Sequence, residues 1–358
     1  MNSLSDKKIA HLRNLVADPD FTGTKYRVIN ELAHGGMGTV FLAEDLELSR
    51  RIAIKVLNAA EGSPDISRRM VREAQVIARL EHPGIVPVHD VGFLPDGRVF
   101  YAMKLVRGER LDEYAAKTES LKDRLRKFQA GCDAVAFAHA HGVIHRDLKP
   151  ANIMIGSFGE VLVLDWGVAK ILDSSQISAE AETLILPNRS RSRDDDNDHE
   201  LATTHQGTII GTPGYMSPEQ ARGETRHLDE RADVYSLGAI LYFLLTGKAP
   251  LGAVPSDEAG NAGRPSAGPN PRTLDQTISK AAEAVCLKAI AAACGDRYAT
   301  AAELSADVGR LLDDEPVSAY RENLFERIFR WLGKNRVLVL IVLAYLLMRI
   351  FFIFTSRR

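Results

Sequence analysis

Cysteine is scarce in this chain, which has only Cys132, Cys286 and Cys294. These residues lie far apart or in no metal-ligand spacing, and no C-x-x-C pair occurs. The sequence therefore excludes a disulfide framework and a cysteine-based metal site. A sparse, odd set of cysteines is typical of reduced, buried thiols in a cytosolic protein.

The chain also lacks an excess of charge of one sign, because its formal net charge is only −2. No global basic field points to nucleic acid as a partner. Residues 1–20 contain no apolar core of about 7 to 15 residues, so we expect no secretory signal there. The length of 358 residues predicts about two domains or lobes.

Long hydrophobic runs are absent until residues 337–354, VLVLIVLAYLLMRIFFIF, which are apolar except for Arg349. A helix of that length spans about 27 Å, close to the thickness of a bilayer core. Its 14 Val, Leu, Ile and Phe residues favour insertion by roughly −6 kcal/mol, against about +3 kcal/mol for the arginine. We predict a transmembrane helix. A buried C-terminal helix is the alternative, disfavoured because the stretch has no polar face.

The hydrophobic pattern predicts a β-rich segment followed by a helical one. Strands are expected around the glycine turn of 26–45 and at 50–57, 85–94 and 98–106. A helix is expected to begin at the N-cap Ser63, with Pro64 as its first residue. Its apolar residues follow helical spacing at Ile66, Met70, Ala74, Ile77 and Leu80. Further helices are expected at 120–142, 227–246, 274–294 and 299–313.

A concentrated polar stretch, VIHRDLKPANIMI, occupies residues 143–155 between apolar runs. Charged residues are almost never fully buried unless paired, so this is either a solvated turn or a polar site. Asp147 could accept a proton there, and Asn152 could hold a metal. Asp165 directly follows the apolar residues of VLVLDWG, and a carboxylate in that position suits Mg²⁺, which prefers oxygen ligands.

Two features of the β-rich segment are consistent with phosphate binding. The glycines of AHGGMG, residues 33–38, would let backbone N–H groups approach an anion closely, although such a loop alone is a weak signal. Lys55 lies in the middle of an apolar strand and needs a counter-charge, which Glu73 on the following helix could supply. The alternative is a lysine on the solvent face of the strand.

Together these motifs, in this order and spacing, resemble the eukaryotic-type Ser/Thr protein kinase family, in particular its membrane-anchored bacterial members. The resemblance covers about residues 25–315. It implies an α+β, bilobal fold with a β-rich N-lobe at 25–106 and a helical C-lobe at 107–316. An N-terminal extension, 1–24, would precede them.

The resemblance also implies a role for each site residue. Asp147 would be the base that orients the substrate hydroxyl, and Lys149 would contact the transferred phosphate. Lys55, braced by Glu73, would hold the ATP phosphates. Asn152 and Asp165 would bind Mg²⁺, with Mn²⁺ as an alternative metal. The remaining ATP-binding residues would be Leu32, Ala33, His34, Gly35, Gly36, Met37, Gly38, Thr39, Val40, Ala53, Met103, Lys104 and Val106. Structural roles fall to His145, Asp233 and an ion pair of Glu219 with Arg297.

The chain departs from the family pattern at several points. Ala33 replaces a glycine of the loop, Trp166 replaces a phenylalanine, and residues 172–202 form an insertion that we expect to be disordered. An active kinase is predicted, with a nucleotide-binding pseudokinase scaffold as the alternative. A Rossmann-type dinucleotide enzyme is excluded, because its glycine motif must run from a strand into a helix.

Regulation is predicted in the activation segment. By resemblance, Arg146 would bind a phosphate on that segment, and Thr203, Thr204 and Thr208 are the candidate sites of autophosphorylation. The alternative is an unmodified, threonine-rich loop.

Residues 317–336 form a basic amphipathic juxtamembrane segment. Trp331 and neighbouring apolar residues alternate with Arg and Lys, which favours a helix on an anionic membrane surface over a plain connector. We expect a single-pass protein of the inner or plasma membrane, with its kinase domain in the cytoplasm where ATP is. Expected partners are protein substrates with Ser or Thr, membrane lipid and a second copy in a homodimer, but no nucleic acid. Such an architecture is that of a bacterial signalling kinase.

Overall fold

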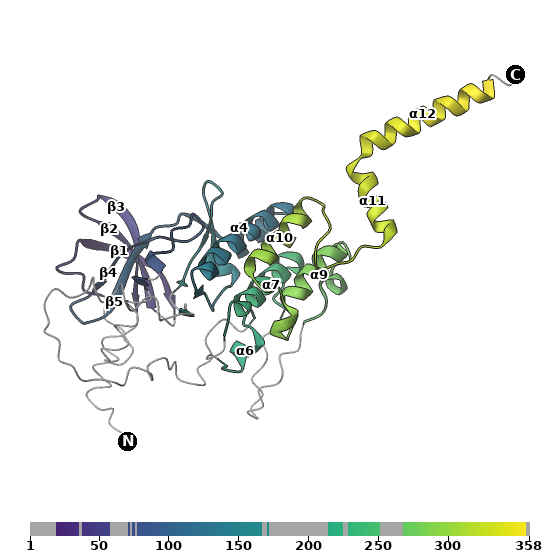
Figure 1. Cartoon of the computed structure of the whole chain (residues 1–358). Helices are drawn as coiled ribbons and strands as arrows, with labels where there is room; N and C mark the ends of the chain where they lie inside the picture. The colour runs from purple at the N-terminus through teal and green to yellow at the C-terminus, as the bar shows by residue number, and fades with distance from the viewer. Residues whose placement is uncertain are drawn as a thin grey trace.

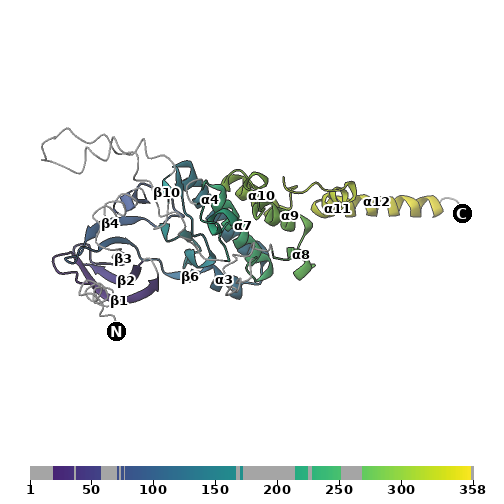
Figure 2. The same cartoon turned by 90° about the horizontal axis from the view of Figure 1, so that it is seen from below.

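The structure is a computed structural model, and it describes most of the chain. The described residues are 19–35, 38–57, 71, 74–75, 77–166, 170–171, 214–224, 228–250 and 268–355. A five-stranded sheet and a group of helices form two lobes, and the last two helices extend away from the helical lobe (Figure 1). The view from below shows the same separation (Figure 2).

The N-lobe sheet is antiparallel, in the order β1-β2-β3-β5-β4. Its strands are β1 (Tyr26–Gly35), β2 (Gly38–Asp45), β3 (Arg50–Leu57), β4 (Val88–Phe93) and β5 (Val99–Lys104). All five fall within the segments where the sequence predicts strands. β5 lies between β3 and β4, so it pairs directly with the strand that carries Lys55.

The two faces of this sheet differ in character, because successive side chains point to opposite sides. One face forms an apolar core that includes Phe41, Ile54, Val56 and Phe100. The alternate residues form the other face, where Val40 lies opposite Lys55 and Ala53 lies opposite Met103. This second face carries the residues expected to bind the nucleotide.

Among the described residues of the C-lobe, its four longest helices share one apolar core. They are α4 (Leu121–Ala140), α7 (Arg231–Thr246), α9 (Lys280–Ala289) and α10 (Ala301–Leu312). Helix α4 begins at Ser120, whose side chain accepts a hydrogen bond from the Asp123 amide. It buries Leu125, Phe128 and Cys132 at helical spacing against its neighbours.

Helix α7 is buried on nearly all sides, as its apolar sequence predicts. It ends at Gly247, whose left-handed backbone, φ 72°, suits a glycine C-cap. Gly238 lets α7 approach α9 closely, since a Cβ there would lie 2.6 Å from the Ala289 Cβ. The predicted bounds 274–294 are too wide, since α9 ends at Ala289 and is preceded by a turn and by the short helix α8 (Pro271–Leu274).

Short elements around the polar stretch position it between the lobes. Strand β7 (Val143–Ile144) leads into it, and the 3-10 turn η1 (Pro150–Asn152) and strand β8 (Ile153–Gly156) follow. Strand β8 pairs with β6 (Gly108–Arg110) on one side and with β9 (Val161–Val163) on the other. The short helices α3 (Leu111–Lys117) and α6 (Pro218–Ala221) and the strand β10 (Lys170–Ile171) complete the C-lobe elements.

The C-terminal residues form helix α11 (Leu324–Lys334) and helix α12 (Arg336–Thr355). In the part of the chain that the structure describes, no helix is both long and apolar enough to cross a membrane. The predicted transmembrane helix is therefore not confirmed. The expectation of buried thiols holds for Cys132 and Cys286 but is wrong for Cys294, which is only half-buried.

Candidate active site

The polar stretch is anchored from beneath by one buried carboxylate. Asp233, at the start of α7, is fully buried and accepts hydrogen bonds from the backbone amides of His145 at 2.7 Å and Arg146 at 2.8 Å. The ring of His139 on α4 lies 2.9 Å from the same carboxylate. Burial raises the pKa of Asp233, but these hydrogen bonds outweigh it, so the pKa lies below its usual value.

His145 links this loop to the segment that carries Asp165. Its Nδ1 accepts a hydrogen bond from the Asp147 amide, and its Nε2 lies 2.8 Å from the Leu164 carbonyl oxygen, to which it can donate. These contacts suit a neutral imidazole protonated at Nε2. The Trp166 ring packs on His145 with 4.7 Å between ring centroids, and its indole N–H donates to the Val163 carbonyl.

Two residues of the site have left-handed backbone conformations that are uncommon outside glycine. Arg146 has φ 71° and Asp165 has φ 58°. Each such residue costs roughly 1 to 3 kcal/mol and persists only where the surroundings impose it, commonly at functional sites. Around Arg146 the described contacts are the hydrogen bonds of its amide to Asp233 and of its carbonyl to Gln220. Around Asp165 they are its contact with Lys55 and the hydrogen bonds that His145 and Trp166 make to the carbonyls of Leu164 and Val163.

Lys55 and Asp165 join the two lobes. The Lys55 ammonium donates to Asp165 Oδ1 at 2.7 Å. Lys55 is only 5% exposed, whereas the Asp165 side chain is 40% exposed. Burial alone lowers the pKa of Lys55, but Tyr101 and Asp165 outweigh it, and the pKa lies above its usual value. The lysine therefore stays charged near neutral pH. It is not on the solvent face of its strand.

Asp147, Lys149 and Asn152 lie together on the loop. Lys149 Nζ is 2.9 Å from Asp147 Oδ2. The Asn152 side-chain amide donates to the Asp147 carbonyl oxygen at 2.8 Å, and it also approaches Oδ2 at 3.4 Å. The Asp147 carboxylate is thus held between a cation and an amide donor, in a geometry suited to receiving a hydroxyl group.

The predicted nucleotide-binding residues that the structure describes lie on or beside the second face of the sheet. The glycine hairpin pairs Gly35 with Gly38, and His34 Nδ1 lies 2.8 Å from the Thr39 hydroxyl. A Cβ at Gly38 would lie 2.3 Å from the Val56 carbonyl oxygen, so only glycine fits. Ala33 pairs with Val40. The other predicted residues are Leu32, which is exposed, Ala53, Met103, Lys104 and Val106.

Several predicted residues lie outside the described part of the chain. They are Gly36, Met37, Glu73, Thr203, Thr204, Thr208 and the insertion 172–202. Their roles stay predictions.

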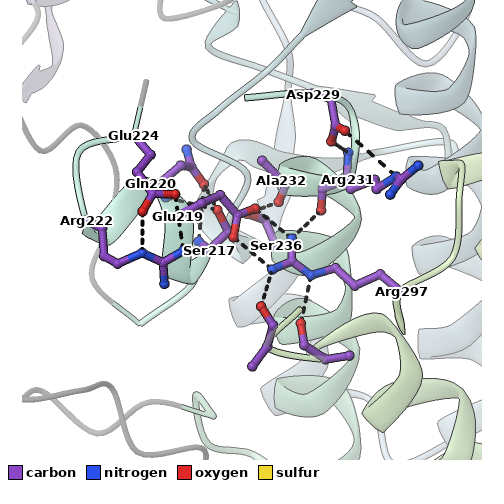
Figure 3. Close-up of polar contacts among 12 residues, drawn as sticks. Ser217, Glu219, Gln220, Arg222, Glu224, Asp229, Arg231, Ala232, Ser236 and Arg297 are labelled. Atoms are coloured by element: carbon purple, nitrogen blue, oxygen red, sulfur yellow. Dashed lines mark hydrogen bonds and ion pairs between the residues drawn. The ribbon is translucent and has the colours of Figure 1, made fainter. Parts of the chain in front are cut away.

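A buried ion pair joins α6, which precedes α7, to the segment between α9 and α10 (Figure 3). Arg297 donates to both oxygens of Glu219, at 2.7 and 2.8 Å, and its side chain is fully buried. The backbone carbonyls of Arg231, Ala291 and Ala292 accept its other hydrogen bonds. Burial raises the pKa of Glu219, but Arg297 outweighs it, so the pKa lies below its usual value.

Two residues that hold the polar stretch in place were not predicted from the sequence. His139 contacts Asp233 across 94 positions, and Gln220 donates from α6 to the Arg146 carbonyl at 2.8 Å. A polar residue within an apolar helix face was the available signal for His139. Gln220 also caps its own helix through Ser217, which the pattern SPEQ could have indicated.

Comparison with known proteins identifies the family. Residues 26–304 match the family described as the protein kinase domain. This match spans more than half of the chain, so the chain belongs to the protein kinase family. Its relatives place it in the eukaryotic-type serine/threonine group, which confirms the predicted class of enzyme. Membership implies ATP and a divalent metal cation as cofactors.

Two bacterial kinases illustrate the similarity. The chain is 40% identical to serine/threonine-protein kinase PknD of Protochlamydia amoebophila over 240 residues, or 63% of this chain and 23% of that relative. It is 38% identical to serine/threonine-protein kinase PknB of Mycolicibacterium smegmatis over 308 residues, or 84% of this chain and 45% of that relative. The chain thus spans less than half the length of these curated relatives.

Solved structures agree with this assignment. The kinase domain of Mycobacterium tuberculosis PknI is similar with a TM-score of 0.57 and 25% identity, over 82% of this chain and 98% of that one. The predicted bilobal kinase fold, with a β-sheet lobe and a helical lobe, is therefore confirmed.

Proposed function

We propose that this chain transfers the γ-phosphate of ATP to Ser or Thr hydroxyls of protein substrates. The observation that carries the proposal is the Lys55–Asp165 contact of 2.7 Å, which joins the N-lobe sheet to the C-lobe at one polar site. Phosphoryl transfer needs positioned charges and little covalent chemistry, and this site supplies both signs of charge.

Each residue has a role that fits its place. Asp147 orients the substrate hydroxyl and takes up its proton, since its carboxylate is held by Lys149 and Asn152. Lys149 is positioned to stabilise charge on the transferred group. Lys55 binds ATP phosphate oxygens in exchange for part of its contact with Asp165.

Mg²⁺ is the cation that suits the donors present. Asn152 and Asp165 offer an amide oxygen and a carboxylate, and the Asn152 amide nitrogen is occupied with Asp147. Among the described residues, no group of three or more His, Cys, Asp or Glu side chains is arranged around a metal. That fits Mg²⁺, which is commonly held by one or two carboxylates together with substrate phosphates and water. The cation neutralises phosphate charge when bound.

The test is transfer of labelled phosphate from ATP to a generic basic protein. Wild type, Asp147→Asn and Lys55→Met would be compared as full chains in detergent. Label in the wild type alone supports the proposal. No label in any chain, with a melting shift on adding Mg·ATP, would instead support the pseudokinase scaffold, which no described feature of the site favours.

We also propose autophosphorylation of the activation segment at Thr203, Thr204 or Thr208. The support is Arg146, which is buried within the polar stretch 143–155 next to Asp147, and whose carbonyl accepts a hydrogen bond from Gln220 on α6, after that segment. Phosphosite mapping on active enzyme tests this. An active enzyme with none of the three modified would contradict it.

Attachment to a membrane is proposed from the C-terminal helices. Along α12 the large apolar side chains whose exposure is described are exposed, including Val337 at 72%, Met348 at 64% and Phe352 at 71%, except for Val339, which is half-buried. Water tolerates such an apolar surface poorly. The sequence continues the apolar character through Leu338, Phe351, Ile353 and Phe354, whose side chains lie outside the described residues. The catalytic lobes would then face the cytoplasm.

Helix α11 would lie on the lipid surface beside this anchor. It exposes Leu324, Phe325, Ile328 and Trp331, while Lys280 binds Glu326 on its C-lobe side at 2.7 Å. An apolar face with neighbouring basic residues is typical of helices at anionic interfaces.

Tryptophan fluorescence tests this placement, because the chain has only two tryptophans and Trp166 is buried. The full chain would be reconstituted in anionic vesicles with brominated acyl chains. Shallow bromines should quench Trp331 most, and Trp331→Phe should abolish that quenching. Emission unaffected by bromine at any depth would contradict the placement.

A further inference from the structure

Tyr101 on β5 lies directly opposite Lys55 on β3. Opposite residues of an antiparallel pair project from the same face of the sheet, with Cβ atoms about 4.5 to 5.5 Å apart. Both residues are buried, with 7% of Tyr101 and 5% of Lys55 exposed. A phenol is therefore placed beside the ammonium group that contacts Asp165.

The described side chains that pack around the Tyr101 ring are apolar. Its ring packs in a cluster with Leu57 and Val99, against the partly buried Val71, Val88, Val91 and Met103. A buried hydroxyl in such a place needs a hydrogen-bond partner. The polar group that the strand pairing places next to the Tyr101 hydroxyl is the Lys55 ammonium, and the two side chains interact. Burial raises the pKa of Tyr101, so the phenol is neutral and can accept from the ammonium group.

An ammonium group has three donors on a flexible stem, and one acceptor does not fix its direction. Asp165 accepts one hydrogen bond from Lys55, at 2.7 Å. The Tyr101 phenol oxygen offers a second acceptor from the opposite strand, on a rigid ring that the apolar cluster holds in place. The lysine thus lies beside two acceptor groups that come from different lobes.

We propose that Tyr101 is a positioning residue for Lys55, whose ammonium group it holds in the direction from which ATP phosphates are bound. This inference rests on the proposed function, because it assumes that Lys55 meets phosphate. When a nucleotide draws Lys55 away from Asp165, the contact with Tyr101 remains and keeps the ammonium group from leaving the site.

The experiment separates the contribution of the phosphates to binding from the contribution of the rest of the nucleotide. Affinities for adenosine and for ADP, at one fixed Mg²⁺ concentration, are measured by calorimetry on the full chain in detergent. Tyr101→Phe keeps the ring and removes only the hydroxyl. We expect the affinity for ADP to fall about tenfold, or ~1.4 kcal/mol, while the affinity for adenosine is unchanged.

A double-mutant cycle with Lys55→Met makes the test specific. In the Lys55→Met background, Tyr101→Phe should not change the affinity for ADP further, because the ammonium group that Tyr101 positions is absent. Tyr242→Phe is the matched control, since it removes another buried hydroxyl, which donates to the Pro269 carbonyl at 2.7 Å in the C-lobe. It should leave both affinities unchanged.

The outcomes are distinguishable. If Tyr101→Phe weakens the binding of adenosine and of ADP equally, or weakens the binding of neither, Tyr101 contributes only to packing and the inference is overturned. An effect that persists in Lys55→Met overturns it as well. If the wild type binds ADP no more tightly than adenosine, Lys55 does not meet phosphate, and the proposed function fails together with the inference.

Discussion

Replacing Asp233 by Asn tests how the loop that carries Asp147 is held. The carboxylate is fully buried. It accepts hydrogen bonds from two backbone amides and lies beside the His139 ring nitrogen, with all three distances between 2.7 and 2.9 Å. An Asn side chain keeps one oxygen and turns an N–H₂ group toward at least one of these donors. The change therefore removes at least one hydrogen bond to a charged group and leaves a buried donor without a partner.

Those losses set the expected magnitude. A hydrogen bond to a charged group contributes about 1.5 to 3 kcal/mol, and an unsatisfied buried donor costs about 1 to 3 kcal/mol. We expect Asp233→Asn to lower the free energy of unfolding by about 3 to 6 kcal/mol, a large part of the roughly 5 to 15 kcal/mol typical of a domain. Phosphate transfer should also fall, because the loop backbone loses its support.

The assay is urea unfolding followed by the fluorescence of Trp166, whose ring packs on His145. Trp331→Phe serves as the background, so that the signal reports the loop alone. The control is Asp229→Asn, the same chemical change at an exposed carboxylate that accepts from the Arg231 amide. An Asp233→Asn chain within about 1 kcal/mol of its parent would refute the reasoning, since mutations away from such features usually stay within about 0.5 kcal/mol.

Three further predictions concern packing and charge in the C-lobe and beside the site. Because the pKa of Glu219 is lowered in the folded state, its pair with Arg297 stabilises fully above about pH 4.5 and is lost as pH falls through the folded pKa. Glu219→Gln should remove that acid dependence and cost about 3 to 5 kcal/mol at neutral pH, measured as unfolding free energy against pH; an unchanged pH profile would contradict this. Gly238→Ala should destabilise by about 1 to 3 kcal/mol, since its Cβ would meet Ala289, and an unshifted melting temperature would count against the close approach of α7 and α9. Trp166→Phe should cost about 1 to 3 kcal/mol through the lost indole hydrogen bond to Val163, and an equally stable variant would show that this bond contributes nothing.

Much of the architecture could be predicted from the sequence, because local patterns determine it. The short apolar run of 50–57 and the helical spacing of 120–142 each predict an element that the structure contains at nearly the same bounds. The turn at 275–279 was not predicted, although its polar residues and the N-cap Ser279 were the available signal for it.

The contacts within the site were harder to predict, because they depend on pairing between distant segments. Tyr101 faces Lys55 only because β5 lies between β3 and β4, an order that hydrophobic patterns do not specify. His139 and Asp233 meet only when α4 and α7 pack together. The pair of Glu219 with Arg297 was expected from resemblance to a family, since no local pattern joins residues 78 positions apart.

The central claim is that this chain phosphorylates serine and threonine. The most direct measurement is the initial rate of phosphate transfer from ATP, with Mg²⁺, to one basic peptide made in four versions. The versions differ at a single acceptor position, which is Ser, Thr, Tyr or Ala. We predict that the full chain phosphorylates the Ser and Thr versions, with one ADP formed for each phosphate transferred, and leaves the Tyr and Ala versions unmodified. Transfer to Tyr, or transfer to none of the four by a chain that binds Mg·ATP, would contradict the account.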